Sequence, residues 1–340
     1  MNTQDLIDTA AAMVANDKGL LAMDESTPTC NKRFAALGIP QSENNRRAYR
    51  ELLVTTPGLG KCISGAILFD ETIRQRLQDG TPFAVTLAQA GIIPGIKVDT
   101  GATGLAGHAG EKVTEGLDRL FDRLTDYVSL GARFAKWRAV ISIGDQIPSR
   151  ACIEANAHGL ARYARLCQES GLVPIIEPEV LMAGGHNLAR CRDVTEETLR
   201  MVFAQLVVQG VALEAIILKP NMVLPGSDSA KPATEDEIAV ATVGCLLRTV
   251  PAAVPGVAFL SGGQSPELAS TRLNAMHVNF GDRLPWAVTF SFSRALQQPV
   301  LAIWKGDVAN TQTAQQALLH RAQINHAARR GAYLPSMEQG

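Results

Sequence analysis

The chain alternates short apolar runs with longer segments in which apolar residues recur at helical spacing. A run that is apolar at nearly every position is typical of a strand covered on both faces, whereas a period near 3.6 residues is typical of an amphipathic helix. We therefore predict a strand in each run and a helix after it. The eight runs are LLAMDE (20–25), CISGAILFD (62–70), PGIKVD (94–99), ARFAKWR (132–138), VPIIEPE (173–179), AIILKP (215–220), GVAFLSGG (256–263) and AVTFSF (287–292).

The segments between the runs carry helix boundary signals. Thr234 followed by Glu237 matches a capping box, in which each side chain satisfies a free backbone N–H of the first turn. Ser265 precedes a proline, a pair that favours the start of a helix. Gly131 and Gly171 follow helical stretches and suit the left-handed position beyond a helix end. These signals support the prediction that strands and helices alternate.

Eight strand–helix units in one chain of 340 residues predict a closed (β/α)8 TIM barrel. A doubly wound open sheet is the alternative, although eight units fit the barrel better. Helical periodicity also predicts an additional N-terminal helix at 3–16 and a C-terminal helix at 313–330. Because no linker or internal repeat interrupts the pattern, we expect residues 1–340 to form a single catalytic domain.

Composition narrows the classes of partner. Hydrophobic residues make up 46% and charged residues 19%, and 32 basic side chains nearly balance 33 acidic ones, for a net charge of -1. This balance predicts neither a nucleic-acid nor a membrane partner, so an anionic ligand needs a local cluster of cations. No apolar stretch approaches the roughly 18 residues of a membrane span, and the N-terminus lacks the basic start of a signal peptide. We therefore expect a soluble, cytoplasmic protein.

The cysteines and histidines do not form metal-binding patterns. The six cysteines occur singly with no C-x-x-C pair, which favours free buried thiols over disulfides or zinc ligands. The six histidines lack the spacing that would place two of them on one helix face. The sequence therefore predicts no metal and no cofactor. The cysteines are Cys30, Cys62, Cys152, Cys167, Cys191 and Cys245, and the histidines are His108, His158, His186, His277, His320 and His326.

Polar residues follow most of the predicted strands, at the barrel end where the active sites of this fold lie. In three strands they form pairs spaced i, i+2, which share one face of a strand and so point inward together. We expect these side chains to meet in one mouth, although any single one could be a solvated rim residue. They are Asp24, the pairs Lys97 and Asp99, Lys136 and Arg138, Glu177 and Glu179, then Lys219, Ser261, Gly262, Gly263 and Arg294.

Lys219 is the most informative of these residues, because it ends the apolar run AIILKP just before Pro220. A lysine there either reaches out to solvent or lies in a dry pocket, where Lys136 nearby would favour its neutral, nucleophilic form. Glu177 or Glu179 would then supply a general acid and base. The surrounding cations and the Ser-Gly-Gly turn suit a phosphate. The residues thus predict attack by a lysine amine on a phosphorylated carbonyl compound.

Several of these segments together resemble the class I, Schiff-base fructose-bisphosphate aldolases. The similarity covers about residues 18–335, in order and at similar spacing. It implies a (β/α)8 barrel, usually a homotetramer, that uses no metal. It also implies reversible cleavage of fructose 1,6-bisphosphate to dihydroxyacetone phosphate and glyceraldehyde 3-phosphate, in glycolysis or gluconeogenesis. The similar segments are LLAMDES, GIKVD, FAKWR, VPIIEPE, LKPNM, FLSGGQS and the RALQ that begins at Arg294, of which LKPNM and FAKWR are the most specific.

The resemblance implies a role for each predicted catalytic residue. Lys219 would form the imine with carbon 2 of the ketose, and Glu177 would carry the protons of imine formation and of the carbon 4 hydroxyl. Asp24 would hold that hydroxyl, and Lys136 would stabilise charge beside the carbinolamine. Glu179 would position Lys219 and its neighbours without reacting.

The resemblance also implies the substrate- and phosphate-binding residues. Ser261, Gly262 and Arg294 would bind the carbon 1 phosphate, while Ser26, Lys97 and Arg138 would face the carbon 6 half. The same set includes Thr29, Gly263, Ser291 and Ser293.

The chain departs from the usual family residues at Thr29, Phe292 and Ser293, where Ser, Tyr and Gly are common. Ser293 matters most, because its Cβ stands where a glycine backbone would approach phosphate. We expect the residues after Pro335 to take no part in turnover, unlike the mobile tail of animal members. Two alternatives remain, another Schiff-base lyase such as a transaldolase and a non-catalytic scaffold. The cations at both ends argue against a transaldolase, and the intact lysines and carboxylates argue against a scaffold.

Overall fold

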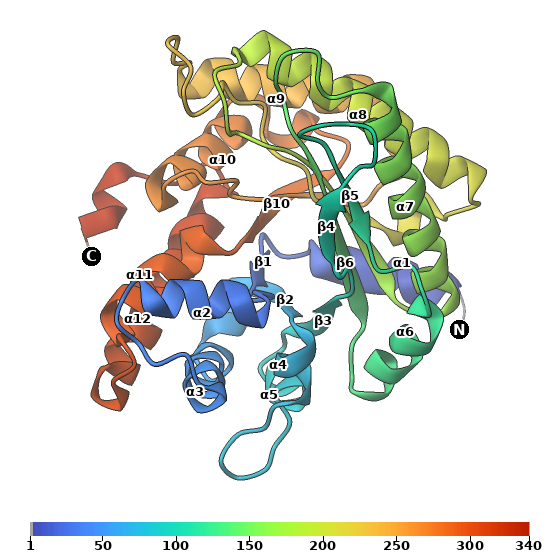
Figure 1. Ribbon diagram of the computed structural model, residues 1–340. Coiled ribbons are helices and arrows are strands. Elements are labelled where there is room, and N and C mark those ends of the chain that lie inside the picture. The colour runs from blue at the N-terminus through green and yellow to red at the C-terminus, as the bar shows by residue number, and fades with distance from the viewer. Residues whose placement is uncertain (1–2, 340) are drawn as a thin grey trace.

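The computed structural model, which describes residues 3–339, is a closed barrel of parallel strands surrounded by helices (Figure 1). Around the barrel the strands follow the order β1-β10-β9-β8-β7-β6-β3-β2. Each of the eight apolar runs provides one of these strands, so the predicted (β/α)8 barrel is confirmed. The barrel strands are β1 (Gly19–Ala22), β2 (Ile63–Leu68), β3 (Ile93–Lys97), β6 (Phe134–Ile141), β7 (Val173–Val180), β8 (Ile217–Leu218), β9 (Gly256–Phe259) and β10 (Ala287–Phe292).

The helices lie outside the barrel, and short 3-10 turns occur in several connections. They are α1 (Thr3–Met13), α2 (Thr27–Ala35), α3 (Glu43–Val54), α4 (Asp70–Arg74), α5 (Phe83–Gln89), α6 (Leu120–Ser129), α7 (Arg150–Glu169), α8 (Leu188–Val208), α9 (Glu235–Thr249), α10 (Pro266–Phe280), α11 (Arg294–Trp304) and α12 (Thr311–Ala328). The 3-10 turns are η1 (Leu59–Lys61), η2 (Leu213–Ala215), η3 (Gly281–Arg283), η4 (Val308–Asn310) and η5 (Pro335–Gln339).

The predicted helix boundaries are close to the observed ones. The capping box of Thr234 and Glu237 opens α9, and Ser265 caps α10. The N-terminal helix ends at Met13, before Asn16 and Asp17, whose φ angles of +55° and +56° lie in the left-handed region and cannot continue a right-handed helix. The C-terminal helix ends at Ala328, before the left-handed Gly331. Residues 1, 2 and 340, which the expected single domain includes, lie outside the described residues.

The lower half of the barrel interior is apolar. Leu6 and Met13 of α1 belong to the same buried cluster as the inward-facing residues of the strands, so α1 closes the end of the barrel opposite to the polar mouth. Phe134 fills part of this interior, and a Cβ at Gly95 would stand 2.2 Å from its ring. The glycine is therefore required by the close approach of the phenylalanine. This dry floor lies directly below the charged residues of the mouth.

Charged residues continue the inward rows of the strands. Ile175 and Ile217 belong to the apolar interior, and Glu177 and Lys219 follow them two residues further along the chain, Lys219 directly after the end of β8. Because side chains alternate between faces, a step of two residues keeps the inward direction. Phe134 is followed in the same way by Lys136. The strands thus carry an apolar layer below and an ionic layer above.

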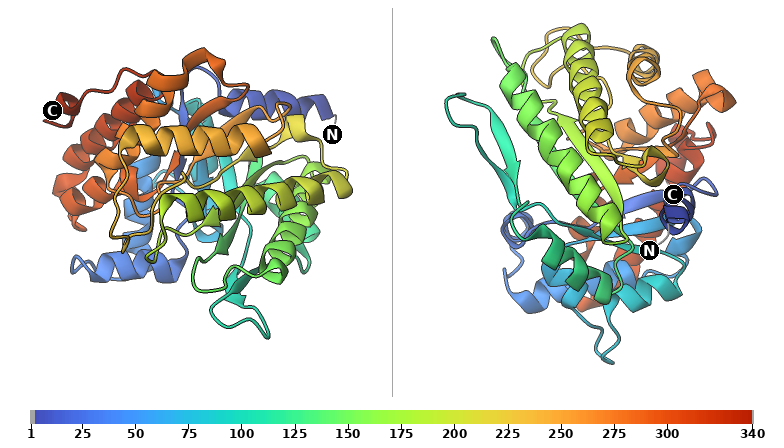
Figure 2. Two further views of the ribbon diagram at one scale, coloured as in Figure 1. Left: turned by 90° about the horizontal axis from the view of Figure 1, so that it is seen from above. Right: turned by 90° about the vertical axis from the view of Figure 1, so that its right-hand side faces the viewer.

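One element was not predicted. Between β3 and α6 the chain forms an antiparallel hairpin of β4 (Gly101–Gly104) and β5 (Lys112–Glu115), which stands out from the barrel (Figure 2). The hairpin strands contain glycine and polar residues and lack an apolar face, so hydrophobic periodicity could not reveal them. Glu111 fixes the hairpin by accepting a hydrogen bond from the backbone N–H of Ser149, at 2.6 Å. The six cysteines are buried and free, as predicted.

Candidate active site

A pocket of about 940 Å³ opens at the carboxyl ends of the barrel strands. Its walls come from the loops after β1, β3, β9 and β10 and from helix α2. The structure brings almost all of the predicted site residues to this pocket, whereas Gly263 does not line it. The predicted residues in the lining are Asp24, Ser26, Thr29, Lys97, Lys136, Arg138, Glu177, Glu179, Lys219, Ser261, Gly262, Ser291, Ser293 and Arg294.

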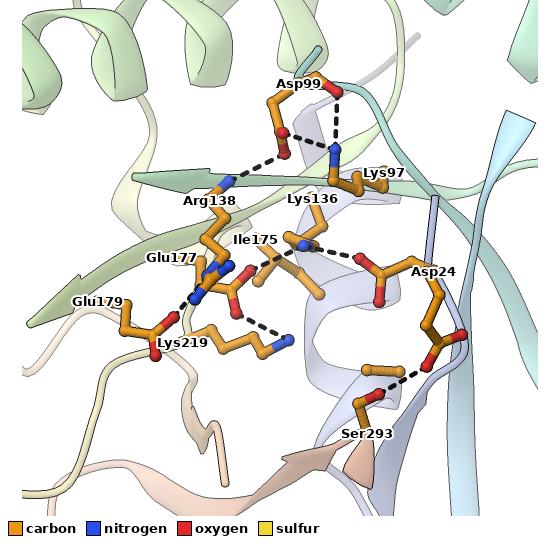
Figure 3. A network of polar contacts seen from close by, with 12 residues as sticks. Asp24, Lys97, Asp99, Lys136, Arg138, Ile175, Glu177, Glu179, Lys219 and Ser293 are labelled. Carbon is orange, nitrogen blue, oxygen red and sulfur yellow. Dashed lines mark hydrogen bonds and ion pairs between the residues drawn. The ribbon is translucent and has the colours of Figure 1, made fainter. Parts of the chain in front are cut away.

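Four charged side chains form a continuous chain of ion pairs in the pocket floor (Figure 3). Lys136 pairs with Asp24 at 2.7 Å and with Oε2 of Glu177 at 2.9 Å. The other oxygen of Glu177 lies 3.0 Å from the ammonium nitrogen of Lys219. The side chains of Lys136, Glu177 and Lys219 are each 4% exposed. Such buried charges persist only because they compensate one another, which is the arrangement expected of reacting groups.

The same neighbours set the protonation of the two carboxylates. Burial alone would raise the pKa of Asp24, but the ammonium groups of Lys136 and Lys219 outweigh burial and lower the pKa to about 2. Burial opposes ionisation of Glu177 as well, yet the same two lysines hold its pKa below the ordinary value. The pKa of Lys136 is raised, since Asp24 and Glu177 more than offset the effect of burial. Both carboxylates are therefore ionised at neutral pH, and Lys136 is charged.

The remaining members of the three i, i+2 pairs also lie in the mouth, and each of the two cations among them already has a carboxylate partner. Nζ of Lys97 is 2.6 Å from Oδ1 of Asp99, and Arg138 donates to Oε2 of Glu179 at 2.5 Å. Glu179 therefore contacts Arg138 and not Lys219, within the described residues. A substrate anion at this end would meet cations that are held in place by carboxylates.

The opposite wall, formed by β10 and the loop after β9, offers groups without protein partners. The hydroxyl of Ser291 is buried and has no hydrogen-bond partner among residues 3–339. Arg294 is exposed and forms no ion pair with any other described residue. Gly262 and Gly263 have φ angles of +53° and +90°, which residues with a Cβ rarely adopt. The tight turn carries Gly262 to the pocket and lets Arg294 lie against Gly263.

The three departures from the usual family residues have different consequences. Thr29 lines the pocket, and its hydroxyl is 3.0 Å from that of Ser26. Phe292 is fully buried against Phe290 and does not line the pocket, so the lack of a hydroxyl there leaves the pocket surface unchanged. Ser293 does line the pocket, where its hydroxyl donates to Glu25 at 2.7 Å.

The sequence did not reveal every residue of the pocket, and three of those it missed are charged residues near the β10 wall. Glu25, Lys32 and Arg33 all line the pocket, and Arg33 pairs with Glu25 at 2.6 Å. Glu25 follows the predicted Asp24 directly, but Lys32 and Arg33 belong to a helix whose orientation the sequence does not reveal. Their only signal is that a helix with two adjacent cations starts immediately after a strand end that carries acidic residues.

Two expectations about binding partners concern the molecule as a whole. Across residues 3–339 no group of three or more His, Cys, Asp and Glu side chains is gathered so that it could hold a metal ion. In the same residues no helix is long and apolar enough to cross a membrane. That the reaction needs no metal and no cofactor stays a prediction.

The fold and the site define a (β/α)8 barrel protein with a buried lysine–carboxylate centre at the carboxyl ends of its strands. A model of the family described as fructose-bisphosphate aldolase class-I matches residues 5–340. The chain therefore belongs to the class I fructose-bisphosphate aldolase family, which confirms the resemblance seen in the sequence.

Relatives with curated names and a solved structure agree with this assignment. A probable fructose-bisphosphate aldolase class 1 of Xanthomonas campestris pv. campestris is 57% identical, over 98% of this chain and 99% of its own length. Fructose-bisphosphate aldolase 6, cytosolic, of Arabidopsis thaliana is 54% identical over 97% of this chain and 91% of its own. The structure of fructose-bisphosphate aldolase from Plasmodium falciparum, in complex with TRAP and a small-molecule inhibitor, has a TM-score of 0.95 at 46% identity, covering 97% of this chain and 95% of that one.

Proposed function

We propose that this protein reversibly cleaves fructose 1,6-bisphosphate to dihydroxyacetone phosphate and glyceraldehyde 3-phosphate through a Schiff base on Lys219. The strongest support is the position of Glu177 between Lys219 and Lys136, at 3.0 Å and 2.9 Å, in a floor where all three side chains are buried. A carboxylate that touches both a nucleophilic amine and a fixed cation can exchange protons with one while the other stabilises developing charge.

In the cleavage direction, the ammonium of Lys219 passes a proton to Glu177, and the resulting neutral amine attacks carbon 2 of the open-chain sugar and forms a carbinolamine. Glu177 passes a proton to the departing hydroxyl, water leaves, and a protonated imine remains. Glu177, ionised again, then removes the proton of the carbon 4 hydroxyl, and the bond between carbons 3 and 4 breaks. Its electron pair moves into the imine and gives an enamine, while carbons 4 to 6 leave as glyceraldehyde 3-phosphate.

The remaining steps return the enzyme to its starting state. Carbon 3 of the enamine takes up a proton, and water hydrolyses the resulting iminium to release dihydroxyacetone phosphate and the Lys219 amine. Asp24, ionised and 12% exposed, holds the carbon 4 hydroxyl during cleavage. Lys136, between Asp24 and Glu177, stabilises negative charge on both sides of the reacting bond. Glu179 accepts a hydrogen bond from Arg138 and so holds that guanidinium in place at the rim of the pocket.

Charge at the two ends of the pocket fits a bisphosphate. Arg294, Ser261 and the Gly262 turn receive the carbon 1 phosphate, and the unpartnered hydroxyl of Ser291 lies beside them. Lys97 and Arg138 receive the carbon 6 phosphate at the other end, with Ser26 and Thr29 along the wall between. Two separated anion sites favour a bisphosphate over the single phosphate of a transaldolase substrate.

Reduction with borohydride tests this function. Wild-type protein treated with dihydroxyacetone phosphate and borohydride is expected to lose activity and to carry a mass adduct on Lys219. The Lys219→Met variant is the matched control and is expected to carry none. Cleavage of fructose 1,6-bisphosphate should continue in EDTA. An adduct on another lysine, or loss of cleavage in EDTA, would contradict the proposal.

We further propose that the chain acts as one catalytic domain within a homotetramer in the cytosol, with sugar phosphates as its small-molecule ligands. Membership of the family supports the quaternary state, and the names of the Arabidopsis thaliana relatives as cytosolic support the location. Light scattering on a size-exclusion column tests the assembly: a mass of four 36.3 kDa chains is expected, and a monomer would contradict it.

A further inference from the structure

Ser293 occupies the position that precedes helix α11, but its hydroxyl does not cap the helix. A serine at this position usually accepts a hydrogen bond from a backbone N–H of the first turn. Ser42, Ser149 and Ser265 do so at the starts of α3, α7 and α10. At Ser293 the side-chain cap is absent, and the backbone angles of φ -106° and ψ -82° turn the residue away from that geometry. The hydroxyl is therefore engaged elsewhere.

The hydroxyl contributes to a hub on a single oxygen of Glu25. Oε1 of Glu25 accepts from Nη1 of Arg33 at 2.6 Å, from Oγ of Ser293 at 2.7 Å and from Nε2 of Gln297 at 2.8 Å. The Glu25 side chain is only 7% exposed, so its charge depends on these donors for compensation. Two of the three donors come from the region of α11, and the third comes from α2. The hub therefore joins the β10–α11 wall of the pocket to helix α2.

Arg33 is the cation of this hub, so it is the member suited to bind an anionic ligand. Its side chain is 26% exposed and lines the pocket, and its Nη2 lies 3.5 Å from the Ser293 hydroxyl. A guanidinium carries five N–H donors, and the contacts with Glu25 and Ser293 leave others for an anion. Ser293 and Glu25 hold the guanidinium on the side of the pocket that also carries Arg294. A side chain that is held in its binding orientation loses less conformational entropy when the ligand arrives.

We infer that Ser293 is a positioning residue for substrate binding: it fixes Glu25 and, through Glu25, the guanidinium of Arg33 beside an anionic group of the sugar phosphate. This inference rests on the proposed aldolase function. The hydrogen bonds of the Ser293 hydroxyl go to Glu25, Arg33 and Gln297 and, among the described residues, to none of Lys219, Glu177 and Lys136, so we expect its effect to fall on binding and not on bond cleavage.

Steady-state kinetics of Ser293→Ala test the inference. Loss of one hydrogen bond to a charged group is expected to raise the KM for fructose 1,6-bisphosphate about fivefold, with kcat within about twofold of wild type. Ser293→Thr keeps the hydroxyl and is expected to restore most of the affinity. Ser42→Ala removes a serine at an equivalent helix position on the exposed surface and serves as the matched control, with kinetics unchanged.

A double-mutant cycle shows whether Ser293 acts through Arg33. In an Arg33→Ala background, Ser293→Ala is expected to have little further effect on KM, because the guanidinium that it positions is gone. Titration of fructose 1,6-bisphosphate into Lys219→Met protein, with and without Ser293→Ala, measures the same loss of affinity without turnover. Thermal melting of each variant shows whether it is folded under the assay conditions.

The outcomes separate this inference from the proposed function. If the wild-type enzyme lacks cleavage activity, the aldolase proposal fails, and the titration still reports on Ser293. If the wild-type enzyme is active but Ser293→Ala leaves KM and the affinity unchanged, the positioning role is wrong. An equal rise in KM with and without Arg33 would also overturn it, because Ser293 would then contact the substrate directly.

Discussion

Lys219 and Glu177 approach one another to 3.0 Å between Nζ and Oε1, and each side chain is only 4% exposed. Glu177 lies on β7 and Lys219 directly after the neighbouring strand β8, in the inward row above the apolar floor. At this separation a proton can pass between the carboxylate and the groups formed at the amine without an intervening water. In the proposed mechanism this pair carries out the bond-making chemistry, and the outer cations bind the phosphates of the substrate.

Replacing Glu177 by glutamine is expected to lower kcat about 100-fold or more, with a modest change in KM. Glutamine keeps the shape of the side chain but cannot carry the proton. Steady-state cleavage of fructose 1,6-bisphosphate measures both constants. Glu179→Gln is the comparison on the same strand, and its kcat should fall less, because Glu179 contacts Arg138 and not the reacting lysine. Equal losses of kcat in the two variants would place the proton carrier elsewhere.

Arg294→Ala is expected to raise KM by a factor corresponding to on the order of 2 kcal/mol, with kcat less affected. The reason is that Arg294 has no ion-pair partner among the described residues, so its charge is available to a phosphate. Arg119→Ala is the control, because that side chain is 86% exposed on the surface and should leave KM unchanged. A fall in kcat with unchanged KM would instead assign Arg294 to the chemistry.

The enzyme is expected to prefer fructose 1,6-bisphosphate strongly over fructose 1-phosphate. Binding energy from the remote carbon 6 phosphate, at Lys97 and Arg138, can orient the reacting centre. The preference is measured as the ratio of the two kcat/KM values. Lys97→Met should reduce this ratio mainly by lowering kcat/KM for the bisphosphate. Equal efficiency with both substrates in the wild-type enzyme would show that the carbon 6 site is misplaced.

Asp24 should link stability to pH in the acid range. The pKa of Asp24 is about 2 in the folded state, below the ordinary value of 3.8. The folded protein therefore stabilises the ionised carboxylate relative to the protonated one. The stabilisation, about 2 kcal/mol, is therefore fully present above pH ~4 and is lost as the pH falls towards ~2. Urea unfolding of wild type and Asp24→Asn should show a stability difference that narrows over that interval. A difference that is constant with pH would contradict the assigned shift.

Deletion of residues 336–340 is expected to leave kcat/KM within about threefold of the parent, which corresponds to ~0.65 kcal/mol. The segment does, however, contain Glu338, whose carboxylate is held by contacts with two other residues. Glu338 forms an ion pair with the buried Arg321 and accepts a hydrogen bond from Tyr333 at 3.1 Å.

The deletion should therefore lower the free energy of unfolding by about 1–3 kcal/mol, since it removes a partner of a buried charge. Glu338→Gln tests the ion pair alone, and its loss of stability should be smaller than that of the deletion. A drop in kcat/KM of more than about tenfold, ~1.4 kcal/mol, would show that the segment assists turnover.

Much of the site could be predicted because strand residues alternate in direction. Once Ile175 and Ile217 are assigned to the barrel interior, Glu177 and Lys219 must point the same way. The same rule applies to Phe134 and Lys136. Arg33 could not be predicted in this way, because it lies on α2, and the angle of a helix over the mouth depends on how it packs against distant residues. Its contact with Ser293 joins positions that are 260 residues apart in the sequence.

The sequence by itself determined the eight barrel strands, the family and the inward-facing charged residues, because apolar periodicity and residue chemistry are local properties. Only the tertiary structure decided which charges pair. It placed Lys136 between Asp24 and Glu177, set Glu179 against Arg138, and turned Ser293 from its helix towards Glu25. These choices depend on distances between strands that are far apart in the chain, and a pairwise Coulomb energy depends on such distances.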